Sequence, residues 1–260
     1  MYEFTHHAAT SVADAVGALG EGKFLAGGQT LLPTMKQRLA MPGHLVDLGK
    51  VAELRGVEEK GDVLVVKAMT RHVEVATSAL VARAVPGLEK LAGMIGDPAV
   101  RNRGTIGGSI ANNDPTADYP AACLALKATI VTNTRRISAD DYFTGLFSTA
   151  LEDGELITAV EFPKAKLHYA KFPNPASRYA MVGVAIVKGA DGVRVAVTGS
   201  GGDGVFRWSE AEAKLKADFS AGALEGMKAD AAGMMSDIHG SAEYRAHLVG
   251  VMARRALSES

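Results

Sequence analysis

Two glycine pairs in similar surroundings constrain this chain more than any other feature. Residues 23–38 read KFLAGGQTLLPTMKQR, and residues 101–120 read RNRGTIGGSIANNDPTADYP. The 29 glycines among 260 residues give about three adjacent pairs by chance, and the chain has three. Only the flanking residues therefore make the first two pairs informative. In both segments Gly-Gly is expected where an apolar strand gives way to a loop or a helix.

The residue types in these two segments suit the binding of an anion. Glycines at such a junction adopt positive φ and admit a phosphate close to the backbone. Pro33 lies early in the helical stretch after the first pair, where its missing N–H costs nothing, and Ser109 adds a hydroxyl after the second pair. With free N–H groups at both helix starts, the two segments would hold a diphosphate from both sides. A pair of ordinary tight turns is the alternative explanation of the same glycines.

Length and composition predict a globular protein of two or three subdomains. The 260 residues are 47% hydrophobic and 22% charged, and the formal net charge is −1. This balance gives no electrostatic reason to expect nucleic acid or an anionic membrane surface as a partner. The longest apolar run, 181–187, is much shorter than the roughly 20 residues of a membrane helix. The first ten residues also lack the pattern of a signal peptide, so we expect no transmembrane segment and a cytoplasmic location.

The residues that usually bind metals are few and scattered. Cys123 is the only cysteine, and its apolar surroundings, AACLALKA, predict a buried helix. One thiol cannot hold an iron–sulfur cluster or form an internal disulfide. The seven histidines show no ligand spacing, and no Walker loop, nucleophile elbow or GxGxxG fingerprint occurs. We therefore expect neither a metal site nor an acid–base catalyst in this chain.

The first two thirds of the chain mix strands and helices without strict alternation. In residues 1–57, a small α/β unit, we predict helices at 11–19 and about 32–39 and strands at 23–26 and 44–47. In residues 58–165 we predict strands at 63–68, 128–133 and 157–162, and helices at 71–77, 85–94 and 119–126. This order favours an α+β fold over a doubly wound sheet.

The last third, residues 166–260, opens with the clearest hairpin pattern in the chain. Asp191-Gly192 separates two apolar strands, 179–188 and 193–199. Residues 199–204, GSGGDG, are expected to be a connecting loop.

Two helices are predicted after that loop. The sequence SEAE at 209–212 is a capping-box pattern that begins the first of them. The second is predicted at 241–257, with one stripe buried by packing: Tyr244, Leu248, Val251 and Met252.

The two glycine segments, together with ADDYFTGLFSTALEDGELITAVEFP at 139–163 and SAEYRAHLVGVMARRAL at 241–257, resemble one known family. They are similar to the FAD-binding medium subunits of molybdenum hydroxylases, the xanthine dehydrogenase family, and nearest to the carbon monoxide dehydrogenase type. The resemblance runs nearly end to end. It implies a two-subdomain FAD-binding module of the PCMH type, residues 1–57 and 58–165. A small α+β C-terminal medium-subunit domain with an antiparallel sheet and helices, residues 166–260, would follow.

The resemblance also implies which residues of the glycine segments bind FAD. The first segment would contribute Leu25, Ala26, Gly27, Gly28, Gln29, Thr30 and Leu31. The second would contribute Thr105, Ile106, Gly107, Gly108, Ser109, Asn112 and Asp118. Without the resemblance, Asp114 and Asp118 fit metal ligands or, better, helix-start caps. Arg101 and Arg103 are further candidates to attract the diphosphate, although exposed arginines are common.

The flavin ring is assigned four residues by the same resemblance: Ile95, Ile157, Lys171 and Tyr179. Ile95 would lie against the isoalloxazine or the ribityl chain, and Tyr179 would shield the ring. Lys171 near the N1–C2 edge would stabilise the anionic reduced flavin. Plain core packing is the alternative for the two isoleucines, and a solvated surface charge is the alternative for Lys171.

The function that the resemblance implies is electron transfer within a larger enzyme. A large chain would carry the molybdenum cofactor and a small chain two [2Fe–2S] clusters, and the three chains would assemble as a dimer of heterotrimers. This chain would pass electrons through FAD to an external acceptor. The alternatives are a stand-alone FAD-dependent oxidase or dehydrogenase that shares the module, and a nucleotide-binding scaffold without turnover.

Overall fold

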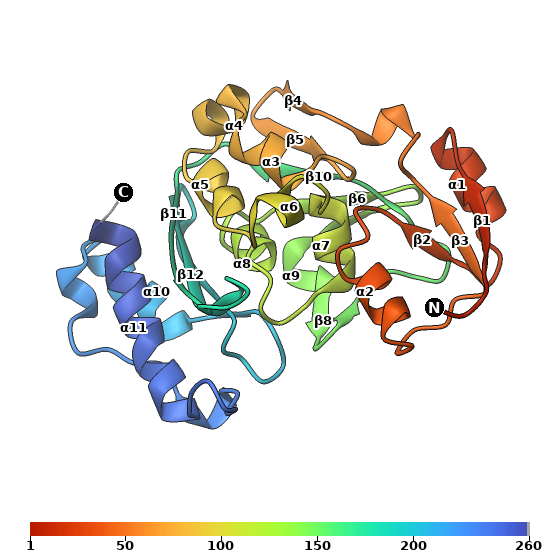
Figure 1. The fold of residues 1–260 in the computed structure, drawn as a ribbon. Coiled ribbons are helices and arrows are strands. Elements are labelled where there is room, and N and C mark those ends of the chain that lie inside the picture. Colours follow the sequence, from red (N-terminus) through yellow and green to blue (C-terminus); the bar gives the residue numbers. More distant parts are fainter. Residues whose placement is uncertain (259–260) are drawn as a thin grey trace.

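The N-terminal unit is a small parallel sheet that carries the first glycine segment at its edge. The computed structural model describes residues 1–258. Strands β1 (Thr5–Ala8), β3 (His44–Asp47) and β2 (Lys23–Leu25) pair in that order and in parallel. Helices α1 (Val12–Ala18) and α2 (Leu31–Lys36) connect them. β2 is a short edge strand, and residues 26–30, which include the glycine pair, connect it to α2. Figure 1 shows β2 and α2 on the side of this unit that faces the middle unit.

The middle unit is built on a five-stranded antiparallel sheet. After a 3-10 turn at Ala52–Leu54, the strand order is β4 (Val57–Lys60), β5 (Val63–Lys67), β10 (Ile157–Pro163), β6 (Thr129–Thr132) and β7 (Arg136–Ser138). A run of short helices and a small hairpin complete the unit: α3 (His72–Ala76), α4 (Ala79–Ala84), α5 (Leu88–Gly93), α6 (Pro98–Arg101), α7 (Ile106–Asn112), α8 (Tyr119–Ala125), α9 (Ala139–Tyr142), β8 (Phe143–Gly145) and β9 (Ser148–Thr149).

The C-terminal unit is an antiparallel sheet covered on both faces. Its strands are β11 (Leu167–Pro173), β12 (Ala180–Gly189), β13 (Gly192–Thr198) and β14 (Phe206–Arg207). Helices α10 (Ser209–Ala217) and α11 (Ala242–Ser258), with 3-10 turns at Gly222–Leu224 and Ala231–Gly233, cover the outer face (Figure 1). The inner face, through Ala185, Val187 and Ala196, joins the core of the middle unit. The α+β class predicted from the sequence is confirmed.

Two helix predictions differ from the structure at their starts. The helix predicted at 85–94 begins only at Leu88, because Pro86 and Gly87, with φ of 99°, interrupt the chain after α4. The helix predicted from SEAE forms, but its N-cap is Trp208 and no side chain caps it. Glu212 instead accepts hydrogen bonds from the Val195 amide and from Arg207.

The buried stripe of the last helix is only partly as predicted. Leu248 and Met252 are buried, whereas Tyr244 is 43% exposed. Arg245 takes the interior position next to it, with its guanidinium on the carbonyls of Met181 and Gly199 and on the Asp237 carboxylate. Its two terminal nitrogens are paired in this way, although the buried Nε has no partner, and these bonds stabilise the arginine in the interior. A count of apolar residues along the helix therefore does not predict it.

Candidate functional site

A cavity of ≈ 880 Å³ brings the two glycine segments together. This volume lies within the range of about 300–1,000 Å³ that is typical of small-molecule sites. All but two of the predicted FAD-binding residues line it: Leu25, Ala26, Gly27, Gly28, Gln29, Thr30, Leu31, Ile95, Thr105, Gly107, Gly108, Ser109, Asn112, Asp118, Ile157 and Tyr179. Ile106 and Lys171 do not line it. Residues from all three units of the fold thus meet at one cavity.

The first glycine pair lets the two segments touch. A Cβ on Gly27 would lie 2.3 Å from the Arg103 carbonyl oxygen and 2.7 Å from the Gly104 Cα, so only glycine fits this contact. Gly28 has a φ of 71°, which favours glycine, and a Cβ there would meet the Leu32 side chain at 2.8 Å. Glycine is therefore needed at both positions: at Gly27 for the close approach of the two segments, and at Gly28 for the positive φ.

The turn after β2 presents a row of unpartnered amides. Among the residues that the structure describes, no acceptor takes the backbone N–H of Gly27, Gly28, Gln29 or Thr30. The chain then enters α2, where the Leu32 amide donates to the Gly28 carbonyl at 3.1 Å. Consecutive free N–H groups at a turn form a concave site for an anion. This part of the cavity fits a phosphate group.

The second glycine pair is arranged differently from the prediction. Gly107 and Gly108 lie inside the first turn of α7, and α6 precedes them where a strand was expected. The first amides of α7 are also occupied. Ile106 donates to the Thr70 carbonyl at 3.1 Å and Gly107 to the Ala68 carbonyl at 2.9 Å. The prediction of free N–H groups at this helix start is therefore wrong for these two residues, because they fasten α7 to the end of β5.

The second segment contributes small size and side chains instead. The Gly108 amide is capped by the Thr105 hydroxyl at 3.2 Å, and a Cβ on Gly108 would lie 3.5 Å from that of Ala26. Ser109 and Asn112 line the cavity from the exposed side of α7. Ile106, which is fully buried, belongs to the core of the middle unit, so its side chain cannot reach a ligand.

Asp118, Lys171 and Tyr169 form a buried cluster beside the cavity. The Lys171 ammonium lies 2.9 Å and 3.0 Å from the two Asp118 oxygens and donates to the Met94 carbonyl at 2.9 Å. Tyr169 donates to the same carboxylate at 2.5 Å. Burial raises the pKa of the Asp118 carboxyl, and the Lys171 charge and the Tyr169 hydroxyl oppose that rise. The capping role considered for Asp118 is wrong, because it makes no side-chain cap bond to α8.

Lys171 is neither a surface charge nor a residue of the cavity wall. Its side chain is 1% exposed, so the alternative of a solvated charge is wrong. The protein holds its ammonium on Asp118, which does line the cavity. Lys171 can therefore influence a ligand through the charge of this pair.

The two isoleucines pack in the core and also border the cavity. Ile157 is 3% exposed and belongs to the central core, while Ile95 packs against that core from the side. Both also border the cavity. The guanidinium of Arg101 donates to the carbonyls of Ile95 and Gly96 at 2.9 Å and 3.0 Å. Arg101 thus fixes the backbone beside Ile95.

Several further cavity residues were not predicted from the sequence, among them Glu155. This carboxylate accepts from the Thr132 and Thr134 hydroxyls, the Arg135 guanidinium and the Glu152 amide at 2.7–3.1 Å. Hydrogen bonds from Arg135 hold the pKa of Glu155 at about 2. The segment from Glu152 to Leu156, which lines one end of the cavity, is held by this side chain together with the hydrogen bonds between Leu156 and Asn133.

Glu155→Gln is expected to destabilise the fold in a pH-dependent way. The folded-state pKa of about 2 lies below the ordinary value of 4.5, so the charged group stabilises the fold above pH 4.5. That contribution, about 3 kcal/mol, is lost as the pH falls from 4.5 towards 2. Urea unfolding of both proteins should show this difference at pH 7 and a smaller one at pH 3. A difference that does not change with pH would contradict the role of the charge.

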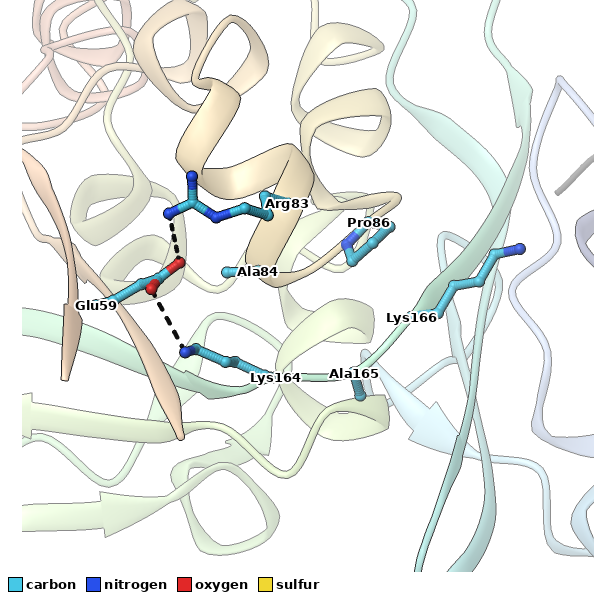
Figure 2. A pocket seen from close by; sticks show the side chains of 7 residues that line it. All are labelled: Glu59, Arg83, Ala84, Pro86, Lys164, Ala165 and Lys166. Carbon is cyan, nitrogen blue, oxygen red and sulfur yellow. Dashed lines mark hydrogen bonds and ion pairs between the residues drawn. The ribbon is translucent and has the colours of Figure 1, made fainter. Parts of the chain in front are cut away.

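A second hollow, of ≈ 340 Å³, contains none of the predicted residues. Figure 2 shows Glu59 between Arg83 and Lys164, with ion pairs of 3.0 Å and 3.5 Å, and Lys166 pointing away from them. Glu59, Arg83 and Lys164 are all at least partly exposed, so the charged groups that line this hollow form a solvated ion-pair network.

Within residues 1–258 no cluster of His, Cys, Asp or Glu could hold a metal ion, and no helix is long and apolar enough to cross a bilayer.

Comparison with known proteins places this chain in a family. The sequence pattern of the FAD binding domain in molybdopterin dehydrogenase matches residues 2–165, and that of the CO dehydrogenase flavoprotein C-terminal domain matches residues 167–260. The carbon monoxide dehydrogenase medium chain of Hydrogenophaga pseudoflava is 36% identical, over 98% of this chain and 96% of its own length. The nicotine 6-hydroxylase medium subunit of Paenarthrobacter nicotinovorans is 37% identical, over 96% and 94%.

A solved structure agrees with these matches. A chain of carbon monoxide dehydrogenase from Hydrogenophaga pseudoflava, in a form that lacks the Mo-pyranopterin moiety of its cofactor, superposes with a TM-score of 0.89. Its sequence identity is 35%, with 98% of this chain and 96% of that chain covered. The chain therefore belongs to the family of FAD-binding medium subunits of molybdenum-containing dehydrogenases.

Proposed function

We propose that this chain holds FAD and passes electrons from the [2Fe–2S] clusters of a small partner chain to an external acceptor. A large partner chain would carry the molybdenum cofactor and oxidise the substrate. The row of free amides at Gly27–Thr30, opposite the small residues at the start of α7, carries the proposal. It fits the diphosphate of a dinucleotide, which needs donors on one side and room on the other. When bound, the flavin accepts and releases electrons.

The roles of the chain's own residues follow from their positions. Gly27, Gly28, Gln29 and Thr30 would bind the diphosphate through their amides. Ser109 and Asn112 would add side-chain hydrogen bonds from α7. Ile95 and Ile157 would form apolar walls, which favour the flat ring over water. The Asp118–Lys171 pair would set the electrostatic potential next to the flavin ring.

The boundaries and the assembly belong to the same proposal. Residues 1–57 and 58–165 would form the two halves of the FAD-binding module, and residues 166–260 would complete the cavity with Tyr179. We infer a dimer of heterotrimers in the cytoplasm. The relatives called medium chain or medium subunit support the presence of partner chains.

The isolated chain is expected to bind one FAD and to contain no iron. Its only cysteine, Cys123, is fully buried on α8, and burial raises the pKa of this thiol. A single inaccessible thiol cannot hold an iron–sulfur cluster. Flavin absorbance and iron analysis of the purified chain would test this. Stoichiometric iron, or substrate turnover without partner chains, would contradict the proposed division of roles.

A further inference from the structure

Asn174 holds the loop that leads to Tyr179 through all of its polar groups. Its amide N–H donates to the Tyr179 carbonyl at 2.8 Å, and its carbonyl accepts from the Arg178 amide at 2.9 Å. Its side-chain oxygen accepts from the amides of Ala176 and Ser177 at 2.9 Å and 3.4 Å. Its side-chain nitrogen donates to the Tyr179 hydroxyl at 3.0 Å. Asn174 is 3% exposed, so water does not compete for these bonds.

The two backbone amides fix which way the Asn174 side chain is turned. If its oxygen and nitrogen were exchanged, the NH₂ group would face the N–H groups of Ala176 and Ser177, donor against donor. The observed orientation is therefore the only one that satisfies the loop. It follows that Tyr179 accepts, and does not donate, in its bond with Asn174.

The hydroxyl proton of Tyr179 consequently has no acceptor among the described residues. Within the part of the chain that the structure describes, this oxygen has no hydrogen-bond partner other than Asn174. Tyr179 lines the cavity, and the His239 ring packs against it edge-on with centroids 6.4 Å apart. The next residue, Ala180, is tied to the Thr116 carbonyl at 3.3 Å. These contacts position the Tyr179 ring, while its hydroxyl proton has no acceptor in the described part of the chain.

We propose that Asn174 is a positioning residue that makes the Tyr179 hydroxyl a hydrogen-bond donor to bound FAD. The inference rests on the proposed function, since it takes FAD as the occupant of the cavity. The recipient would be an acceptor atom of FAD. Without Asn174, the hydroxyl could rotate its proton towards the protein, and the donor would be lost.

A double-mutant cycle on FAD affinity tests the inference. Asn174→Asp keeps the shape and the two bonds to the backbone amides, but its second oxygen accepts the Tyr179 proton. Tyr179→Phe removes the hydroxyl. We expect Tyr179→Phe to weaken FAD binding about 3- to 10-fold, the usual effect of one hydrogen bond. We expect Asn174→Asp to weaken it by a similar factor in the presence of Tyr179, and by a clearly smaller factor in the Tyr179→Phe background.

The measurements are the FAD dissociation constant of the apoprotein and the absorption spectrum of the bound flavin. Asn102→Asp, which adds the same charge on an exposed side chain outside the cavity, is the control. An unchanged affinity in Tyr179→Phe, or an equal effect of Asn174→Asp in both backgrounds, would overturn the inference. Failure of the unmodified chain to bind FAD would overturn the proposed function instead.

Discussion

Gly28→Val is expected to reduce FAD affinity by at least about 100-fold, roughly 3 kcal/mol, in a chain that still folds. Gly28 has a φ of 71°, and a branched side chain is strongly disfavoured there. Its Cβ would also meet Leu32 at 2.8 Å. The Leu32 side chain can turn aside, but relief of the backbone strain requires the turn to change its conformation, which would displace the four free amides that the proposed diphosphate needs.

Fluorescence titration of the apoprotein with FAD measures this effect. Gly43→Val is the matched control, because nothing lies within 4 Å of a Cβ at that glycine and it does not line the cavity. Circular dichroism should show both variants folded. A Gly28→Val protein that keeps its full flavin content would contradict the role assigned to this turn.

Features set by a few neighbouring residues were predictable from the sequence. Asp191-Gly192 predicted the β12–β13 hairpin, and Gly192 does adopt a φ of 121°. The first glycine pair similarly predicted a turn from strand to helix. In both cases the backbone conformation is decided by glycine itself, so no distant contact is needed to anticipate it.

Features set by distant partners were not predictable. Asp118 has the position of a helix cap in the sequence, yet its carboxylate pairs with Lys171, 53 residues away. Tyr244, which was predicted to be buried, is exposed, and the neighbouring Arg245 is buried, because the carbonyls of Met181 and Gly199 accept hydrogen bonds from the arginine inside the protein. The amides of Ile106 and Gly107 at the start of α7 are likewise taken by distant carbonyls, those of Thr70 and Ala68. A local pattern names the candidate residues, whereas the tertiary contacts decide which groups remain free.

Lys171→Met is expected to destabilise the fold by about 3–5 kcal/mol, the usual effect of leaving a buried ion without its partner. Asp118 is 4% exposed, so water cannot replace the lost ammonium. The Tyr169 hydroxyl alone would remain on the carboxylate. Lys127→Met is the control, because the Lys127–Asp191 pair has a similar distance, 2.6 Å, but is 46% and 78% exposed. We expect a much smaller loss there, because solvent screens an exposed pair.

Urea unfolding of both variants measures this difference in the free energy of unfolding. Asp118→Asn added to Lys171→Met should recover part of the lost stability, because it removes the unpaired charge.

Spectroelectrochemical titration of Lys171→Met gives a second, independent result. Since Asp118 lines the cavity, removal of the lysine makes the local potential more negative and disfavours the reduced flavin. The midpoint potential should fall by about 30 mV, which corresponds to about 1.4 kcal/mol for two electrons. An unchanged potential in a variant that is destabilised would confine Lys171 to a structural role.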